Sequence, residues 1–252
     1  MAGLQWYRDD LTRQWPFLRT AFHGDERSDA AVEELLRSNA GGHAFYVTNI
    51  FPQGAAFLWR DHALAPDGML WRLEDTKGQD FAFTSGRVNQ LWSKYQLRNL
   101  HQAGKKYWDD YTDVMKDSYG QACSYTGDYA MVNRMPDVAQ WSYEKALQYN
   151  QPQVLGITYL KLADSELALG RPLDAISHYQ QSIQREPRSP AQPYFYAPYA
   201  YARLGYAFLM EKDYAEAEDA FRYSLSINPQ QKEALEGIRE LERVQGDMKK
   251  RS

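Results

Sequence analysis

Apolar residues in the second half of the chain recur with helical spacing and form a pattern of helix pairs. Between residues 201 and 229 they predict a first helix and a second helix. The apolar and small positions are Tyr201, Leu204, Gly205 and Phe208 on the first helix, and Ala217, Phe221 and Ser224 on the second. Gly205 and Ala217 are small enough for the helices to cross closely, and Pro229 ends the second helix. The sequence therefore predicts a tightly packed helix pair.

The same scheme recurs upstream. A second copy has its positions at Tyr159, Leu162, Ala163, Gly170, Ala175, Tyr179, Ser182 and Pro187, with Glu166 where an aromatic residue is usual. A third copy resembles only a second helix, at Pro136, Ala139, Tyr143 and Ala146, because its first-helix positions fall on Cys123, Thr126 and Gly127. Ala139 and Ala175 are 36 residues apart, and Ala175 and Ala217 are 42 apart. The pattern is that of tetratricopeptide repeats, whose usual length is about 34 residues, and the third copy is degenerate.

Two segments next to the repeats do not follow the repeat pattern. Residues 188–198 are rich in proline and tyrosine, which predicts an extended connector or a lengthened helix start at the edge of the repeats. After Pro229, the spacing of Leu235, Ile238 and Leu241 predicts an amphipathic helix, and the polar tail from Asp247 is expected to fray. We interpret this helix as a cap that covers the last apolar face of the stack.

Stacked helix pairs of this kind imply a concave groove lined by the first helices, which holds a peptide or a partner helix. The residues expected to line it are Asp164, Leu167, Tyr199, Ala202, Tyr206 and Leu209. The alternative is that these side chains pack against a neighbouring helix or domain. In chaperone-binding relatives, Lys and Asn clamp a C-terminal carboxylate, but those positions here are Leu160, Asp164, Ala202 and Tyr206. We therefore expect a protein or peptide ligand other than such a chaperone tail.

The first 90 residues follow a different pattern. Residues 4–18 and 28–42 are predicted to be amphipathic helices. Residues 43–49 and 69–75 have the composition of strands, and residues 54–64 between them suit a short helix. A strand, a crossover helix and a strand within about 30 residues predict a βαβ unit with parallel strands. The polar residues 75–90 are expected to link this unit to helices from Leu91 onward.

These patterns define the expected architecture. The fold class is mainly α, with a small N-terminal α/β (βαβ) element followed by tetratricopeptide-type helix pairs in a short right-handed solenoid with a C-terminal capping helix. The expected domains are a small α/β domain at residues 1–90, a helical region with a degenerate repeat at 91–155, two repeats at 156–231, and the capping helix and tail at 232–252.

Composition, net charge and residue spacing argue against several classes of function. A net charge of −4 argues against nucleic acid as a partner, and no apolar run reaches the roughly 18 to 20 residues that span a bilayer. The single cysteine, Cys123, excludes an internal disulfide and is expected to be a small buried residue. Asp61 and His62 are neighbours in the predicted helix and point apart, and Asp109 and Asp110 lack the spacing of a calcium loop. We expect no metal site, no cofactor and no catalytic residue in this chain.

Short aromatic strings suggest a wider resemblance. Trp6 and Tyr7, residues 44–49, residues 68–73 and, more weakly, the Tyr-Trp-Asp-Asp string at 107–110 resemble the soluble C-terminal part of bacterial membrane glycosyltransferases of the protein O-mannosyltransferase-like type. In that family the catalytic acidic residues lie in a membrane domain, and the sugar comes from a polyprenyl-phosphate donor. The resemblance implies a non-catalytic, extracytoplasmic support domain that recruits acceptor protein or contacts its own membrane domain, with residues 43–75 as a docking wedge.

Two other functions stay open from the residues alone. The first is a free-standing tetratricopeptide adaptor, which would bind a peptide or partner helix and would be cytoplasmic. The second, and weakest, is a small enzyme built around Arg60, Asp61 and His62 in the α/β element.

Overall fold

The computed structural model describes residues 45–47, 62–68, 70–75, 84–94, 110–149, 152–186 and 196–251. The chain divides into two compact units, Met1–Phe83 and Thr84–Ser252. The helices predicted at residues 4–18 and 28–42 lie outside the described residues, and so does most of the proline-rich connector at 188–198.

The described part of the first unit is a three-stranded antiparallel sheet. Strand β1 spans Phe45–Val47, β2 spans His62–Asp67 and β3 spans Leu70–Asp75, in the order β1-β3-β2. Asp67 pairs with Leu70, so two residues join β2 to β3, and the first of them, Gly68, has a φ of 72°. A connection this short suits a hairpin, because parallel neighbours need a crossover of a dozen or more residues.

This sheet corrects two predictions. The predicted βαβ unit is wrong, because β1 and β2 both pair antiparallel with β3. The helix predicted at residues 54–64 is wrong at its end, where His62, Ala63 and Leu64 belong to β2. The apolar run of residues 62–66 has no helical period, and the Pro-Asp-Gly turn after it allows the strand to fold back at once.

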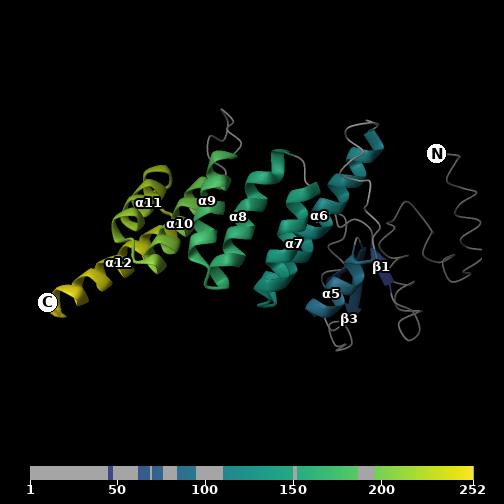
Figure 1. Cartoon of the computed structure of the whole chain (residues 1–252), viewed down its shortest axis with the longest axis horizontal. Helices are drawn as coiled ribbons and strands as arrows, with labels where there is room; N and C mark the ends of the chain where they lie inside the picture. Colours follow the sequence, from purple (N-terminus) through teal and green to yellow (C-terminus); the bar gives the residue numbers. More distant parts are fainter. Residues whose placement is uncertain are drawn as a thin grey trace, which may run out of the picture. The chain divides into compact units, whose positions relative to one another are not determined.

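The second unit is a row of helices (Figure 1). Its helices are α5 (Ser85–Trp92), α6 (Asp110–Val132), α7 (Pro136–Tyr149), α8 (Pro152–Ala168), α9 (Pro172–Gln184), α10 (Ala197–Glu211), α11 (Tyr214–Ile227) and α12 (Lys232–Arg251). Helices α6 and α7, α8 and α9, and α10 and α11 pack as three pairs, and each pair packs on the next. The mainly α fold with tetratricopeptide-type helix pairs is confirmed. Among the helices that the structure describes, none has both the length and the apolar character needed to cross a membrane.

Small residues on the first helix of a pair allow an aromatic ring of the second helix to pack against its backbone. A Cβ atom on Gly205 would lie 2.6 Å from the Phe221 ring, and one on Gly127 would overlap the Tyr143 ring. Both pairs thus use the same close crossing, in which the glycine and the aromatic residue are 16 residues apart in sequence. The degenerate copy is therefore a full helix pair, and its first-helix positions Cys123, Thr126 and Gly127 are all buried on α6.

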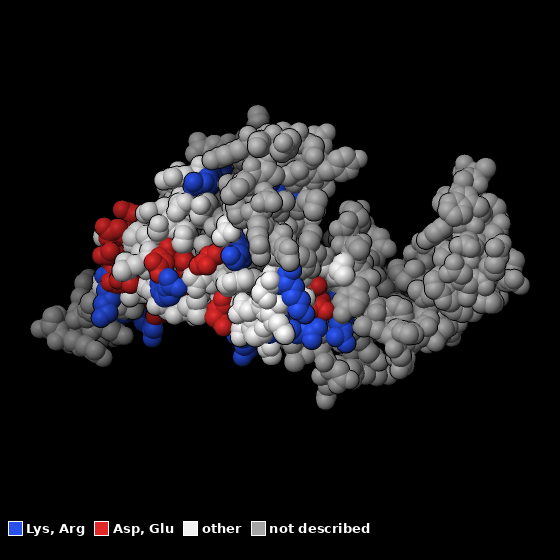
Figure 2. Space-filling view, turned by 45° about the vertical axis from the view of Figure 1, so that its right-hand side comes forward, with Lys and Arg blue, Asp and Glu red and all other residues white. Residues whose placement is uncertain are grey.

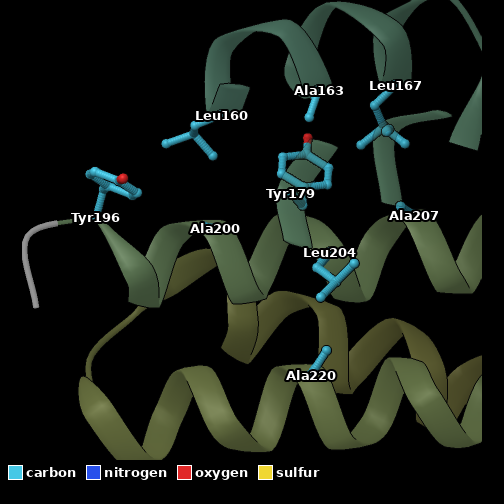
Figure 3. Packing of buried hydrophobic residues seen from close by; sticks show 10 residues of the cluster. Leu160, Ala163, Leu167, Tyr179, Tyr196, Ala200, Leu204, Ala207 and Ala220 are labelled. Atoms are coloured by element: carbon cyan, nitrogen blue, oxygen red, sulfur yellow. The ribbon is translucent and has the colours of Figure 1, made fainter. Parts of the chain in front are cut away.

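The core runs between successive pairs. Tyr179 of α9 is fully buried and lies between Ala163 of α8 and Leu204 of α10 (Figure 3). A second cluster joins Ala202, Ala217, Phe221 and Ala234, with Ile238 packed against it. Each aromatic ring therefore contacts its own pair and the next helix along the row, which makes neighbouring pairs interdependent.

One helix covers each end of this row, the short α5 at the N-terminal end and α12 at the C-terminal end. At the N-terminal end, α5 begins at the cap residue Thr84, whose Oγ1 accepts a bond from Arg87 N at 3.2 Å, and Trp92 packs edge-on against Tyr119 of α6 with ring centroids 4.9 Å apart. The prediction that residues 75–90 form only a polar link is therefore wrong over Ser85–Gln90. Thr84 caps the first turn of α5, and the polar composition of this segment did not indicate that a helix begins there.

At the C-terminal end the predicted capping helix is confirmed as α12. Ala234 and Leu241 are buried and Ile238 is half-buried, but Leu235 is exposed, contrary to the predicted stripe. The buried face is rotated because Gly237 sits against the Phe221 ring, which turns Ala234 rather than Leu235 inward. The tail was expected to fray from Asp247, whereas the helix continues to Arg251.

Two equivalent serines give a matched test of buried hydrogen bonding. Ser224 Oγ donates to Pro198 O at 2.6 Å, whereas the buried Ser182 Oγ has no partner among the described residues. The corresponding residue of the first pair is Ala146. We expect Ser224→Ala to cost about 1 kcal/mol, because it removes a buried hydrogen bond, and Ser182→Ala to be neutral or slightly stabilising. Urea unfolding of both variants checks this, and equal losses would contradict it.

Candidate functional site

The first helices of successive pairs, α6, α8, α10 and α12, together form the surface that we call the first-helix face. Neighbouring members of this series contact each other in sequence order, α6 with α8, α8 with α10, and α10 with α12. Side chains that project from one first helix therefore meet side chains of the next.

Asp164 of α8 is the centre of the largest polar group on this face. Its carboxylate accepts bonds from Tyr179 Oη at 2.6 Å, Arg203 Nε at 2.9 Å and Tyr199 Oη at 3.2 Å. The Asp164 side chain is only 18% exposed, and that of Arg203 is 27% exposed. One carboxylate thus joins the second helix of its own pair to the first helix of the next pair.

Asp128 of α6 repeats this arrangement one unit earlier. It accepts from Tyr143 Oη at 2.9 Å and from Lys161 Nζ at 2.7 Å. Asp128 and Asp164 are 36 residues apart, as are Tyr143 and Tyr179. The same offset separates Ala139 from Ala175, so the Asp–Tyr–cation group is a feature of the repeat. At 40% exposure, however, the Asp128 side chain is more accessible than Asp164.

The third pair replaces this polar group with aromatic packing. Tyr206 is the counterpart of Asp164 and Phe221 is the counterpart of Tyr179, both 42 residues later. Their rings pack edge-on with centroids 5.2 Å apart, and Tyr206 Oη donates to Glu233 O of α12 at 3.1 Å. A tyrosine hydroxyl thus connects α10 to the capping helix where an aspartate connects the earlier helices.

Burial and negative charge keep these tyrosines protonated. Burial raises the pKa of Tyr143 and of Tyr179 above the ordinary range, and the charges of Asp128 and Asp164 respectively add to the effect. Burial and then Asp164 raise the pKa of Tyr199 to about 12. The hydroxyls therefore act as hydrogen-bond donors at neutral pH.

The predicted groove residues have different surroundings. Leu167 and Ala202 are buried in the helix-packing clusters and do not line a surface. Leu209 is half-buried against the second cluster, and Asp164, Tyr199 and Tyr206 belong to the polar groups described above. Sequence reasoning missed the cations Lys161 and Arg203 and the carboxylate of Asp128. The identical offsets of Asp128 and Tyr143 from Asp164 and Tyr179 were the available signal.

The remaining candidates for chemistry are structural. Cys123 is completely buried, as expected, and burial raises the pKa of its thiol to about 12. Glu166, which replaces an aromatic residue of the repeat, is buried and lies 2.7 Å from Nδ1 of His178. His62, predicted to be helical beside Asp61, lies on β2. Within the described ranges, no group of three or more His, Cys, Asp and Glu side chains is placed to hold a metal ion.

Glu186 anchors the start of α10 across the proline-rich connector. Its buried Oε1 accepts from Tyr196 N at 2.6 Å and from Ala197 N at 2.7 Å. A carboxylate at this position satisfies backbone N–H groups that the first turn of a helix leaves unpaired. The long interval between the second and third pairs therefore does not loosen α10, which carries Tyr199 and Arg203.

The raised pKa values predict a loss of stability at alkaline pH. Burial raises the pKa of Cys123 from 9.0 to about 12, and burial with the Asp164 charge raises that of Tyr199 from 10.0 to about 12. A pKa that is higher in the folded chain contributes stability in full below the unfolded pKa, and this contribution is lost as the pH rises toward the folded value. We expect the free energy of unfolding to fall from about pH 9, where the contribution of Cys123 begins to be lost, and more steeply above about pH 10, where that of Tyr199 follows.

Urea unfolding at about pH 8, 9.5 and 10.5 measures this dependence. Cys123→Ala should flatten the first part of the decline, which begins near the lower of the two unfolded pKa values. A stability that is constant or rising over this interval would contradict the assignment.

A comparison with protein families supports the third helix pair. Residues 198–231 match the tetratricopeptide repeat family. The TPR domain of Arabidopsis OM64 is similar in structure, with a TM-score of 0.44, 21% identity, and coverage of 51% of this chain and 98% of that one. The first TPR domain of Spaghetti (RPAP3), bound to an HSP90 peptide, has a TM-score of 0.44 and 17% identity, covering 52% of this chain and 95% of that one.

A third similar structure is the Sgt2 TPR domain from Aspergillus fumigatus, with a TM-score of 0.44, 18% identity, and coverage of 52% of this chain and 82% of that one. The sequence matches no curated protein. The matched residues span the third helix pair, α10 and α11, and the two pairs before it repeat the same small and aromatic positions. The third helix pair is therefore a tetratricopeptide repeat.

Proposed function

We propose that the helical unit is a non-catalytic interaction module that binds a peptide or helix of a partner protein on the first-helix face. The observation that carries this proposal is the series of bonds between neighbouring first helices, Asp128 to Lys161, Asp164 to Arg203 and Tyr206 to Glu233. These bonds hold partly exposed tyrosines and charged groups in fixed positions along one surface. Fixed side chains lose little conformational freedom on binding, which favours recognition of an extended partner.

Site-specific photo-crosslinking tests the proposal. A photoreactive phenylalanine analogue is placed at Leu209, on the first-helix face, and in a separate protein at Tyr223, which is 48% exposed on the second helix α11. We expect a discrete crosslinked partner from position 209 and none from position 223. The same partner from both positions, or from position 223 alone, would overturn the proposed surface.

The cellular setting of this module is a further part of the proposal. The aromatic strings of the first unit favour an extracytoplasmic arm of a polyprenyl-phosphate-dependent membrane glycosyltransferase, in which the first-helix face recruits acceptor protein. A free-standing, cytoplasmic adaptor is the alternative. Mass spectrometry of the endogenous protein in membrane and soluble fractions separates the two, because only the first predicts peptides that continue upstream into hydrophobic helices.

A further inference from the structure

The short helix α5 is held on the first helix pair by aromatic rings. The buried ring of Trp92 packs edge-on against Tyr119 of α6, with centroids 4.9 Å apart, and its centroid lies 6.4 Å from that of Trp141 of α7. Tyr149 of α7 packs edge-on against Tyr119 with centroids 4.6 Å apart. Val88, one helical turn before Trp92, is buried as well. We call the rings of Tyr119, Trp141 and Tyr149 the α5 site.

The helix α5 depends on this site for its order. It is eight residues long, and an isolated helix shorter than about 12 residues is marginal in water. Gly86 lowers its helix propensity further, and its exposed side carries the polar residues Asn89 and Gln90. Two buried anchors four residues apart, on an otherwise polar helix, are the pattern by which an amphipathic helix docks on a partner.

The place of α5 in the row differs from that of the later helices. Each later pair packs on the pair before it, whereas α5 is the only described helix that precedes α6. Residues 93–109 join α5 to α6, so a released α5 stays tethered at an effective concentration on the order of millimolar. A segment tethered in this way is docked in roughly nine molecules of ten when its own Kd is about 0.1 mM.

The aromatic rings set the chemistry of a ligand for the α5 site. Lys145 of α7 lies beside them, with its Nζ 5.9 Å from the centroid of the Trp141 ring. On the face that Figure 2 shows, Lys and Arg side chains lie among Asp and Glu side chains, so charge by itself does not mark a docking surface there. Selection by apolar and aromatic contact is therefore the property that distinguishes the α5 site.

We propose that the α5 site is a second docking site, which accepts an amphipathic helix of a partner that carries Trp and, one turn before it, a β-branched residue. In the free protein α5 is the exchangeable segment that occupies this site, with Trp92 and Val88 as its anchors. A partner helix with the same two anchors displaces α5 and leaves the three helix pairs intact. This site is separate from the partly exposed side chains of the first-helix face, so either can exist without the other.

Hydrogen exchange of the full chain tests whether α5 is exchangeable. We expect the amides of α5 to exchange at least about tenfold faster than those of α7, because α5 can leave without unfolding of the helix pairs. A Cβ atom on Gly86 meets no other atom within 4 Å, so Gly86→Ala should slow the exchange of α5 by about twofold to fivefold and leave α7 unchanged. Equal exchange rates in α5 and α7 would overturn the proposal.

A peptide of residues 84–94 with a fluorescent label at its N-terminus is the probe for the α5 site. We expect fluorescence anisotropy to show binding to the full-length Trp92→Ala chain with a Kd of about 0.1 mM, and about tenfold weaker binding to the unchanged chain, whose own α5 competes. Binding to the Gly86→Ala chain should be weaker still. The same peptide with Trp92→Ala is the control and should bind none of the three chains.

The outcomes of this experiment decide the proposal. Equal binding to all three chains would place the peptide elsewhere on the protein and would overturn it. A Trp92→Ala chain that keeps its helical circular dichroism but does not bind the peptide would also overturn it. A Trp92→Ala chain that does not fold would show that α5 is a fixed part of the core, with the same consequence. None of these results bears on crosslinking from position 209, which tests the first-helix face.

Discussion

Replacing Phe221 with alanine should lower the free energy of unfolding by about 3–5 kcal/mol, which is the usual cost of truncating a buried aromatic ring. The ring is completely buried and occupies the place where α10, α11 and α12 meet. It packs against the backbone of Gly205 and of Gly237 and edge-on against Tyr206. The truncation therefore leaves a cavity that three helices border and that backbone glycines cannot fill.

Tyr223 provides the matched control on the same helix. Its ring is 48% exposed and contacts Tyr201, with centroids 4.4 Å apart. We expect Tyr223→Ala to cost about 1 kcal/mol or less. Urea unfolding followed by circular dichroism measures both variants, and a loss in Phe221→Ala no larger than that in Tyr223→Ala would contradict the packing described here.

Replacing Asp164 with alanine should cost about 3 kcal/mol, more than the same change at Asp128. At Asp164 the substitution removes the acceptor of two tyrosine hydroxyls and the ion-pair partner of Arg203, all in a site with little access to water. Removing one member of a buried charged pair is expensive because the other is left uncompensated.

Asp128 holds the same place in the first pair and is the built-in comparison. It has one tyrosine and one lysine as partners, and water reaches its carboxylate and Lys161 more freely. We expect Asp128→Ala to cost about 1 kcal/mol. Asp164→Asn, which keeps an acceptor oxygen but removes the charge, should fall between the two. Equal losses of unfolding free energy at positions 128 and 164 would contradict a larger contribution of the Asp164 group to stability.

The helix pairs could be predicted from sequence because their cause is local. A glycine or alanine on one helix and an aromatic residue about 15 positions later are required wherever two helices cross closely, and Gly205 with Phe221 and Ala163 with Tyr179 show this directly. The same rule identifies Gly127 with Tyr143, although the other positions of that copy are unusual. The predicted cap followed from amphipathic spacing alone.

The strands of the first unit could be predicted only in part, because strand pairing depends on residues that are distant in the sequence. Residues 43–49 and 69–75 were predicted as strands, and β1 and β3 lie within them. The pairing partner could not be predicted, because the helix predicted at residues 54–64 overlaps the first three residues of strand β2. Pairing with β3 gives the backbone groups of residues 62–67 their hydrogen-bond partners, and such nonlocal pairing overrides a weak helical preference.

The candidate surface was only partly accessible to sequence reasoning. Asp164, Tyr199 and Tyr206 were predicted to face the groove along the first helices, yet Leu167 and Ala202, predicted with them, are buried. The spacing of residues along one helix shows which side chains share a face, but it does not show which neighbouring helix buries that face. Burial depends on the angle at which the next helix packs.

The amino-acid sequence by itself thus determined the order of the last two helix pairs, the aromatic and small residues at their crossings, and the position of the cap. These follow from spacing within about 40 residues of chain. Only the tertiary structure decided that Asp128 and Asp164 bind cations from the next first helix and that Tyr206 donates a hydrogen bond to the backbone carbonyl of Glu233. Those contacts depend on how one pair stacks on another, and a carboxylate acquires its role only when that packing excludes water and brings its partners within a few ångströms.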